Sequence, residues 1–336
     1  MEEKEKEEKK REIRERIARV SHDLYESNLV RGRGGNISHR LGESAFYITP
    51  HHCSLKDVNP DDLILMNLEG KVLEGSLDPS YETLLHMDIY RSYPLKAVIH
   101  AHPPYTIASS LSCKRIPPLH FESAFLLGDV PVIPQETPTV VDTLPVLEAL
   151  RKNSIIVIKH HGIISVGETI NDAYYLCDLL EESAKIFAIS KLFGEPLPIP
   201  GPKRVKETKT KSTRDLFSDN HLAEMVNISN KDKELGRWGR AKDFTTLLGL
   251  EIAEDHSRWT FSFLKGRITE VKKGGEAQFL LKAPRSVWKL IFNEEINPLV
   301  AAFQGKLIIE GKLSSLSIWY FPLQRFFDLW KRIKVR

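Results

Sequence analysis

The stretch AVIHAHPPY, Ala97–Tyr105, places two histidines at the end of an apolar, β-branched run. Such a run predicts a buried strand, and side chains two residues apart on a strand point to the same face. His100 and His102 should therefore converge on one point. Two imidazoles placed in this way either bind a metal ion or are hydrogen-bonded histidines at a strand end.

A second apolar run, IIVIKHHGIISVG (155–167), carries two more histidines where one predicted strand ends and the next begins. The glycine that follows them allows a tight turn. A catalytic zinc site takes three protein ligands and keeps one position open. Either His160 or His161 could supply the third ligand, and the spacing alone does not choose between them.

Glu82 is the candidate catalytic carboxylate. It lies in a predicted helix, PSYETLLHMDIYRSY (79–93), with His86 four residues later on the same face. A carboxylate beside a metal ion can take a proton from the carbon next to a carbonyl group. The alternative is a helix-capping or surface glutamate, with Ser80 just ahead of it. The residues alone favour this alternative.

Composition limits the class of protein. A chain of 336 residues suggests about two domains. Its content of 41% hydrophobic and 28% charged residues is typical of a globular protein. Its net charge of +3 is too small to indicate nucleic-acid binding. It has no apolar run of about 18 residues, so we expect no membrane span. The charged N-terminus and three unpaired-looking cysteines predict a cytoplasmic protein without a secretory signal.

Helical and strand patterns alternate up to Gly194, after an N-terminal helix with one apolar face formed by Ile13, Ile17, Val20 and Leu24. We predict strands at 46–49, 63–66, 96–102 and 155–159, and helices at 79–93 and 171–193.

The stretch EPLPIPGPKRVKETKTKSTRD (195–215) is typical of an extended linker. A hairpin at 259–271, a strand at 275–283, a helix and a strand pair at 306–320 should follow. The predicted domains are therefore 1–195 and 221–336, joined by a Pro/Lys-rich linker at 196–220.

Five motifs, in this order, resemble the class II aldolase/adducin family over about residues 10–195, and in particular its L-fuculose-1-phosphate aldolase branch: GRGGNIS, FYITP, PSYETLLHMDIYR, AVIHAHPPY and KHHGIISVG. The resemblance implies an α/β/α sandwich around a mostly antiparallel sheet, and a homotetramer with active sites at subunit contacts. It implies one Zn²⁺ per subunit, bound by His100, His102 and His161. It also makes Glu82 the proton-transferring residue.

The function implied is that of a zinc-dependent, aldolase-type lyase acting on a sugar or sugar phosphate through a metal-stabilised enediolate. Dehydration and epimerisation use the same zinc platform, so a dehydratase or epimerase is the nearest alternative. A non-catalytic, adducin-like scaffold is the alternative from a different class, and a lipid-transfer protein with a vestigial aldolase domain is a third.

The substrate contacts depart from the family pattern. Gly35, Asn36 and Ser80 keep the types that hold a substrate phosphate in the family. His51, His52 and Tyr81 stand where the family has small hydrogen-bond donors. These bulky side chains could crowd a phosphate, bind an anion themselves or contact an unphosphorylated substrate. Two surface histidines in a loop are the remaining interpretation.

A second departure concerns the tyrosine that the family's aldolases use to protonate the aldehyde oxygen. The corresponding stretch, IPPLHFES, offers Phe121, which has no hydroxyl group. His120 is adjacent, but neighbours on a strand face opposite ways. Tyr105 or Tyr47 could substitute.

From about Phe244 to Trp330 the chain resembles the sterol-carrier-protein (SCP-2-like) domain, most specifically in NPLVAAFQGKLIIEGKL. The resemblance implies a small α+β domain with a five-stranded sheet, helices on one side and an apolar tunnel for lipid. Five apolar residues at helical spacing could line that tunnel or form a plain core, which is the commoner case: Trp288, Ile291, Phe292, Leu299 and Phe303. The aromatic and basic tail could lie on a membrane, but we expect it to pack on the sheet or on another subunit.

Overall fold

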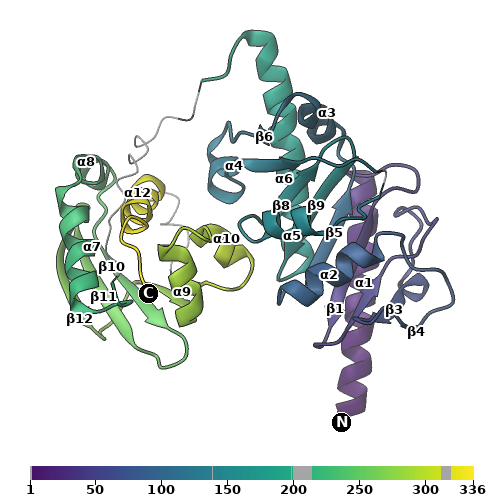
Figure 1. Cartoon of the computed structure of the whole chain (residues 1–336), viewed down its shortest axis with the longest axis horizontal. Coiled ribbons are helices and arrows are strands. Elements are labelled where there is room, and N and C mark those ends of the chain that lie inside the picture. Colours follow the sequence, from purple (N-terminus) through teal and green to yellow (C-terminus); the bar gives the residue numbers. More distant parts are fainter. Residues whose placement is uncertain (1, 138, 198, 200–213, 312–318) are drawn as a thin grey trace. The chain divides into compact units, whose positions relative to one another are not determined.

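The computed structural model describes residues 2–137, 139–197, 199, 214–311 and 319–336. The chain divides into two compact units, Met1–Ile199 and Pro200–Arg336, which are seen in Figure 1. Most of the expected linker at 196–220, and residues 312–318 of the expected strand pair, lie outside the described residues.

The first unit alternates helices and strands, in this order: α1 (Glu2–Glu26), β1 (Asn36–Leu41), β2 (Ala45–Ile48), η1 (Pro60–Asp62), β3 (Ile64–Asn67), β4 (Val72–Glu74), α2 (Thr83–Ser92), β5 (Ala97–Ala101), α3 (Pro104–Ser112), β6 (Arg115–Ile116), α4 (Phe121–Leu126), β7 (Val130–Ile133), α5 (Leu144–Leu150), β8 (Ile155–Ile158), β9 (Gly162–Gly167), α6 (Ile170–Ser190) and η2 (Lys191–Phe193).

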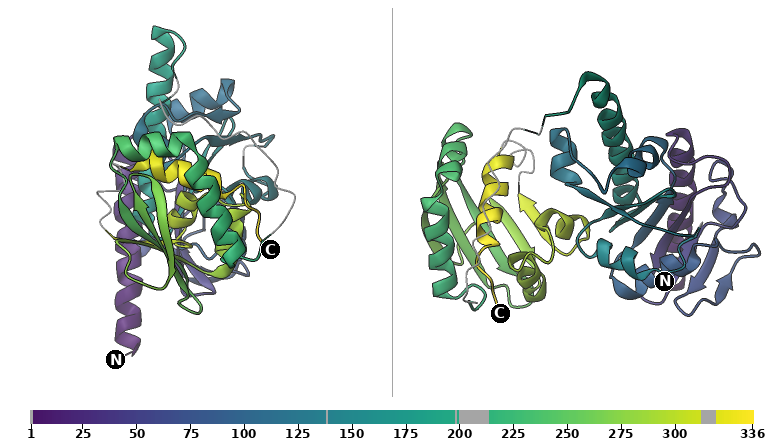
Figure 2. Two further views of the ribbon diagram at one scale, coloured as in Figure 1. Left: turned by 90° about the vertical axis from the view of Figure 1, so that its left-hand side faces the viewer. Right: turned by 45° about the horizontal axis from the view of Figure 1, so that its top comes forward.

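These strands form a nine-stranded sheet in the order β4-β3-β2-β1-β5-β9-β8-β7-β6. Only the β7–β8 pair is parallel, so the predicted, mostly antiparallel sheet is confirmed. Helices α1 and α6 contact β1, β5 and β9, and α3 packs on α6. The views in Figure 2 show α1 and α6 beside the sheet.

The opposite face of this sheet packs against α2 and α5. Its core includes side chains from alternate positions of the central strands and from both helices: Phe46, Ile48, Leu85, Ile89, Val98, Val146, Leu150, Ile164 and Val166. His100 is two residues beyond Val98 and therefore points to this α2 face. The apolar stripe predicted for α1 is confirmed, because Ile13, Ile17, Val20 and Leu24 are all buried.

The second unit contains α7 (Asp219–Lys231), α8 (Lys233–Ala241), β10 (Thr246–Ile252), β11 (Arg258–Leu264), β12 (Arg267–Lys273), β13 (Phe279–Ala283), α9 (Arg285–Phe292), α10 (Pro298–Phe303), β14 (Ile308–Gly311) and α12 (Tyr320–Trp330). The expected five-stranded sheet is confirmed, with the order β12-β11-β10-β13-β14. The predicted hairpin turns at Lys265 and Gly266, which both have positive φ.

The core of this unit is rich in aromatic side chains. Trp288 and Phe292 of α9 are buried in it together with Ile291. The aromatic tail packs on the sheet, as expected. The ring of Trp330 lies 5.0 Å from Phe261 and 3.4 Å from Phe326, centroid to centroid. The side chains of Leu299 and Phe303 lie outside the described residues.

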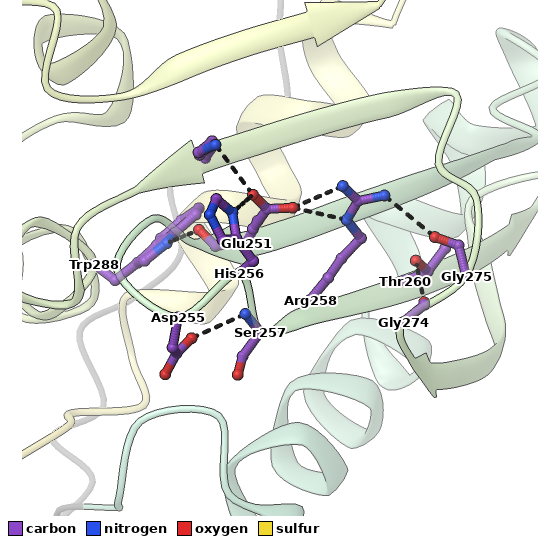
Figure 3. Close-up of polar contacts among 10 residues, drawn as sticks. Glu251, Asp255, His256, Ser257, Arg258, Thr260, Gly274, Gly275 and Trp288 are labelled. Carbon is purple, nitrogen blue, oxygen red and sulfur yellow. Dashed lines mark hydrogen bonds and ion pairs between the residues drawn. The ribbon is translucent and has the colours of Figure 1, made fainter.

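An ion cluster centred on the buried Glu251 occupies the other face of β10, where Glu251 points away from the core that Leu250 and Ile252 join. One carboxylate oxygen of Glu251 accepts hydrogen bonds from Nε and Nη2 of Arg258 at 2.9 and 2.7 Å. The other lies 3.2 Å from His256 Nδ1 and 3.3 Å from Lys282 Nζ. Figure 3 shows these groups meeting around the carboxylate.

The cluster lines a polar cavity of about 410 Å³. Burial by itself would raise the pKa of Glu251, whose side chain is 4% exposed. The hydrogen bonds from Arg258, His256 and Lys282 outweigh burial, and the pKa is lowered. The carboxylate is therefore ionised and neutralises the cations around it.

We expect Glu251→Gln to lower the free energy of unfolding of the second unit by about 1 to 2 kcal/mol, because Arg258 and Lys282, which are partly exposed, would lose their buried counter-ion. Chemical denaturation of the full chain, followed by tryptophan fluorescence, measures this. Glu310→Gln is the matched control, since Glu310 lines the same cavity but is exposed. Equal stability of the two variants would contradict the assignment of the cluster as structural.

Candidate metal centre

Three histidines meet at the end of β5. Their ligand nitrogens all lie within 4.8 Å of one another, which makes His100, His102 and His161 a possible metal site. Nε2 of His100 is 2.9 Å from Nε2 of His102 and 3.2 Å from Nε2 of His161. His160 is exposed and does not join this group. The two candidates that the spacing left open are thus distinguished by the fold.

Strand register brings the rings together. Within the antiparallel ladder β5 pairs with β9 so that His100 lies opposite Ile164 and Ala101 opposite Ile163. His161 ends the tight turn between β8 and β9. The main-chain oxygen of Ile163 accepts a hydrogen bond from His100 Nδ1 at 2.9 Å, which leaves Nε2 directed at the other rings.

Two glycines make room for His102. A Cβ atom on Gly162 would lie 2.2 Å from the oxygen of Ala101 and 2.7 Å from the His102 ring. A Cβ atom on Gly34 would lie 2.4 Å from His102 Nδ1. The glycine of the HHG motif was expected to serve the turn itself. That expectation was wrong, because His160 has the positive φ (64°) and Gly162 is needed for close approach.

All three imidazoles are neutral near neutral pH. Burial, followed by the proximity of His102 and His161, holds the pKa of His100 well below its usual value. Burial also lowers the pKa of His161, and with the neighbouring His161 it lowers that of His102 to about 4. Neutral imidazole nitrogens in a set of three fit a catalytic divalent transition-metal ion, zinc included.

Glu82 is buried and lies just ahead of helix α2, which begins at Thr83 rather than at 79. Glu82 occupies the N-cap position of α2, but its side chain makes no capping hydrogen bond and is buried, so it is neither a capping side chain nor a surface glutamate. The carboxylate accepts a hydrogen bond from the backbone of Val140, while Oε2 has no partner among the described residues. Burial raises the pKa of Glu82 to about 7.

One turn beyond Glu82, the His86 side chain is hydrogen-bonded to two residues of β1. Nε2 of His86 lies 2.6 Å from Asn36 Oδ1, and Nδ1 lies 2.6 Å from Ser38 Oγ. Burial lowers the pKa of His86 to about 3, so its ring is neutral. Because an amide oxygen only accepts, His86 Nε2–H donates to Asn36. Asn36 lies opposite His100 in the β1–β5 ladder, and its amide NH₂ is left to donate elsewhere.

Three of the remaining predicted substrate residues, His51, His52 and Tyr81, form an aromatic cluster of their own. The ring of His51 lies 3.4 Å from that of Tyr81 and 3.5 Å from that of His52, centroid to centroid. His51 Nε2 is buried without a partner among the described residues. The hydroxyl of Ser80 accepts a hydrogen bond from the amide of Glu82 at 3.3 Å.

Gly35 sits where the Asn36 loop approaches β5. It has positive φ (80°), and a Cβ atom there would lie 2.9 Å from the oxygen of His100. A larger residue would therefore displace the strand end that carries the first ligand.

The expectations for the residue that would protonate the aldehyde oxygen of the substrate need correction. Phe121 begins helix α4, and His120 is its N-cap, so the assumed strand is wrong. His120 bonds to Ser183 at 3.1 Å. The hydroxyl of Tyr47 lies 3.4 Å from Glu74, and Tyr47 points to the α1 side of the sheet, away from His100. Tyr105 is partly exposed at the start of α3.

Sequence reasoning missed Gln135, whose amide nitrogen lies 3.2 Å from Nδ1 of His161. It also missed the roles of His86 and Gly34. Gln135 follows β7, which pairs in parallel with β8. Recognising it would have required that pairing in advance, because nothing local in the sequence marks the residue.

Comparisons with known proteins agree with this geometry. Residues 15–188, just over half of the 336 residues, match the class II aldolase and adducin N-terminal domain family. The L-fuculose phosphate aldolase of Methanococcus vannielii is 31% identical over 180 residues, covering 53% of this chain and 96% of that protein. The 3-oxo-tetronate 4-phosphate decarboxylase of Escherichia coli K12 is 29% identical over 188 residues, covering 53% of this chain and 86% of that protein.

Among solved structures, an L-fuculose 1-phosphate aldolase superposes with a TM-score of 0.53 and 26% identity, covering 56% of this chain and 91% of that one. Residues 228–316 match the SCP-2 sterol transfer family. Within the described part of the chain, no helix has the length and apolarity needed to cross a membrane. The first unit thus has the sheet, the motifs and the histidine cluster in place, and the chain belongs to the class II aldolase and adducin family.

Proposed function

We propose that this protein is a metal-dependent lyase that cleaves a carbon–carbon bond in a hydroxylated carbonyl compound of the sugar or sugar-phosphate class. One observation carries the proposal: three neutral imidazoles converge through Nε2, and a buried glutamate occupies the N-cap position of helix α2, which packs on the sheet face to which His100 points. The similarity to L-fuculose phosphate aldolase supports the same reaction class.

His100, His102 and His161 would hold the ion, and Zn²⁺ suits a set of three imidazole ligands. When bound, such an ion stabilises the negative charge that develops on a carbonyl oxygen. The protein's part is to keep the rings neutral and aimed. The hydrogen bond from His100 Nδ1 to Ile163 does this for the first ligand.

Glu82 would transfer the proton at the carbon beside the carbonyl group. Its carboxyl group returns a proton to that carbon during cleavage, and its carboxylate removes one during condensation. A pKa of about 7 allows both forms at neutral pH. Oε2 has no partner among the described residues and is free to face the substrate.

Two further groups would orient the substrate. His86 holds the oxygen of the Asn36 amide, so the amide NH₂ is available to donate to a substrate oxygen. His51 presents a buried Nε2 that has no partner among the described residues, and its ring lies against that of Tyr81 at an interplanar angle of 42°. A hydroxyl or phosphate oxygen of the substrate would satisfy this nitrogen.

The buried glutamate argues against a purely structural, adducin-like role. Burying a carboxyl group without full hydrogen bonding costs stability, and a scaffold gains nothing from it. The decarboxylase relative indicates that the same site can support another outcome, so the test must follow several products. The homotetramer implied by the family stays a prediction.

For the second unit we propose an apolar ligand, in keeping with its match to the SCP-2 sterol transfer family. His221 is fully buried, its Nε2 has no partner among the described residues, and its ring lies 4.8 Å from that of Phe292, centroid to centroid. A polar atom in such surroundings suits a ligand with one hydroxyl or carbonyl group.

We expect one zinc ion per chain in the purified protein and its loss in His102→Ala, which removes one of three ligands. Elemental analysis by mass spectrometry measures both. His160→Asn is the matched control, because asparagine tolerates the positive φ of that turn and His160 lies outside the cluster. A folded wild-type protein that takes up no zinc would rule out the metal site.

Screening sugar phosphates and their unphosphorylated analogues, with separate readouts for carbon–carbon cleavage, water loss and carbon dioxide release, tests the reaction. On the substrate found, Glu82→Gln should lower kcat by at least about 100-fold while zinc remains bound. Turnover that survives the substitution would remove Glu82 from the mechanism.

The free energy of unfolding of Glu82→Gln should also depend on pH differently from that of the wild type. The pKa of Glu82 is raised from 4.5 to about 7 in the fold, so wild-type stability falls as the pH rises from 4.5 to 7. Metal-free Glu82→Gln lacks this loss and should be more stable than wild type above pH 7 by about 3 kcal/mol. Denaturation at pH 5 and pH 8 measures the difference, and parallel curves would contradict the raised pKa.

Organic extracts of the full chain should contain a bound lipid, detectable by mass spectrometry, and His221→Leu should change which lipids are retained because their polar group loses its partner. Lysozyme prepared in the same way is the control for carry-over. Extracts without lipid, from protein also unable to take up a fluorescent fatty acid, would contradict the proposal.

A further inference from the structure

Gln135 contacts the histidine cluster from outside. It follows β7 and is half-buried, and its amide nitrogen lies 3.2 Å from Nδ1 of His161. The same nitrogen donates a hydrogen bond to the main-chain oxygen of Thr137. One amide NH₂ group thus makes both contacts, one through each hydrogen.

This contact determines which nitrogen of His161 carries the proton. Because Gln135 donates to Nδ1, that nitrogen must be the acceptor, and the single proton of the neutral ring is on Nε2. Nε2–H then points at Nε2 of His100, 3.2 Å away, which His102 Nε2 also faces at 2.9 Å. His100 can accept it, because its own proton is on Nδ1 and is donated to Ile163.

A metal ion requires the opposite arrangement at His161. Its Nε2 must offer a lone pair, so the ring proton must be on Nδ1, where it needs an acceptor. An amide nitrogen facing Nδ1–H would set two donors against each other. The carbonyl oxygen of the same amide is an acceptor that a rotation of the side chain can bring to Nδ1.

We infer that Gln135 is a positioning residue for the metal centre, whose amide turns its oxygen toward His161 Nδ1 when the cation binds. The inference rests on the proposed metal site. The rotation breaks the hydrogen bond to Thr137. It forms a new one from His161 Nδ1–H to the Gln135 amide oxygen, which fixes the tautomer of His161 that can bind the metal ion. No proton is gained or lost overall, since it moves from Nε2 to Nδ1 of the same ring.

Zinc affinity should therefore follow the order Gln135→Glu, wild type, Gln135→Leu, from tightest to weakest. A carboxylate accepts from Nδ1–H without rotating, whereas leucine cannot accept, and loss of such an outer partner costs about 10- to 100-fold in affinity. Titration of the metal-free full chain with Zn²⁺ against a chelating dye measures this. Gln278→Leu is the control, because that amide bonds to Thr246 and Leu247 in the second unit.

Nitrogen-15 spectra of histidine-labelled protein give a readout independent of affinity. His161 should be the Nε2–H tautomer without metal and the Nδ1–H tautomer with zinc. An unchanged tautomer, or equal zinc affinity in wild type and Gln135→Leu, would overturn the role of Gln135. Failure of the wild type to bind zinc would overturn the metal site itself, so the two failures are distinguishable.

Discussion

The hydrogen bond from His100 Nδ1 to the main-chain oxygen of Ile163 is the contact on which the first unit's chemistry depends. It spans two adjacent strands, so it exists only when β5 and β9 pair in the observed register. A slip of one residue would turn His100 to the other face of the sheet. The bond fixes the proton on one nitrogen and leaves the other as a lone pair that faces His102 and His161.

Two buried glutamates show how surroundings decide what a carboxyl group does. Glu251 is surrounded by cations, which lower its pKa, so it is a permanently ionised structural anchor. Glu82 is buried with one backbone donor, so its pKa rises to about 7 and it can exchange a proton near neutral pH. The first arrangement stabilises its unit, whereas the second costs stability and is expected only where a reaction uses it.

The polar groups of the site lie on the face of the sheet that packs against helix α2. Asn36 and His100 from neighbouring strands meet His86 from the helix above them, and Glu82 lies one turn before His86. The hydrogen bonds of this network run in one direction, because the neutral His86 ring donates from Nε2 to the Asn36 side-chain oxygen. Its last donor, the Asn36 amide, is the group that we propose contacts the substrate. His51, His52 and Tyr81 form a second, aromatic cluster, and Tyr81 lies between Ser80 and Glu82 in the sequence.

The sequence by itself determined the fold class, the paired histidines of HAH and the amphipathic stripe of α1, because these follow from local periodicity. It did not distinguish His160 from His161 as the third ligand. It also placed Phe121 on a strand and favoured a capping or surface role for Glu82. Only the tertiary structure decided these points: the turn puts its positive φ on His160, and the burial of Glu82 depends on residues far away in the chain. Gln135 could not be foreseen for the same reason, since its contact with His161 requires the pairing of β7 with β8.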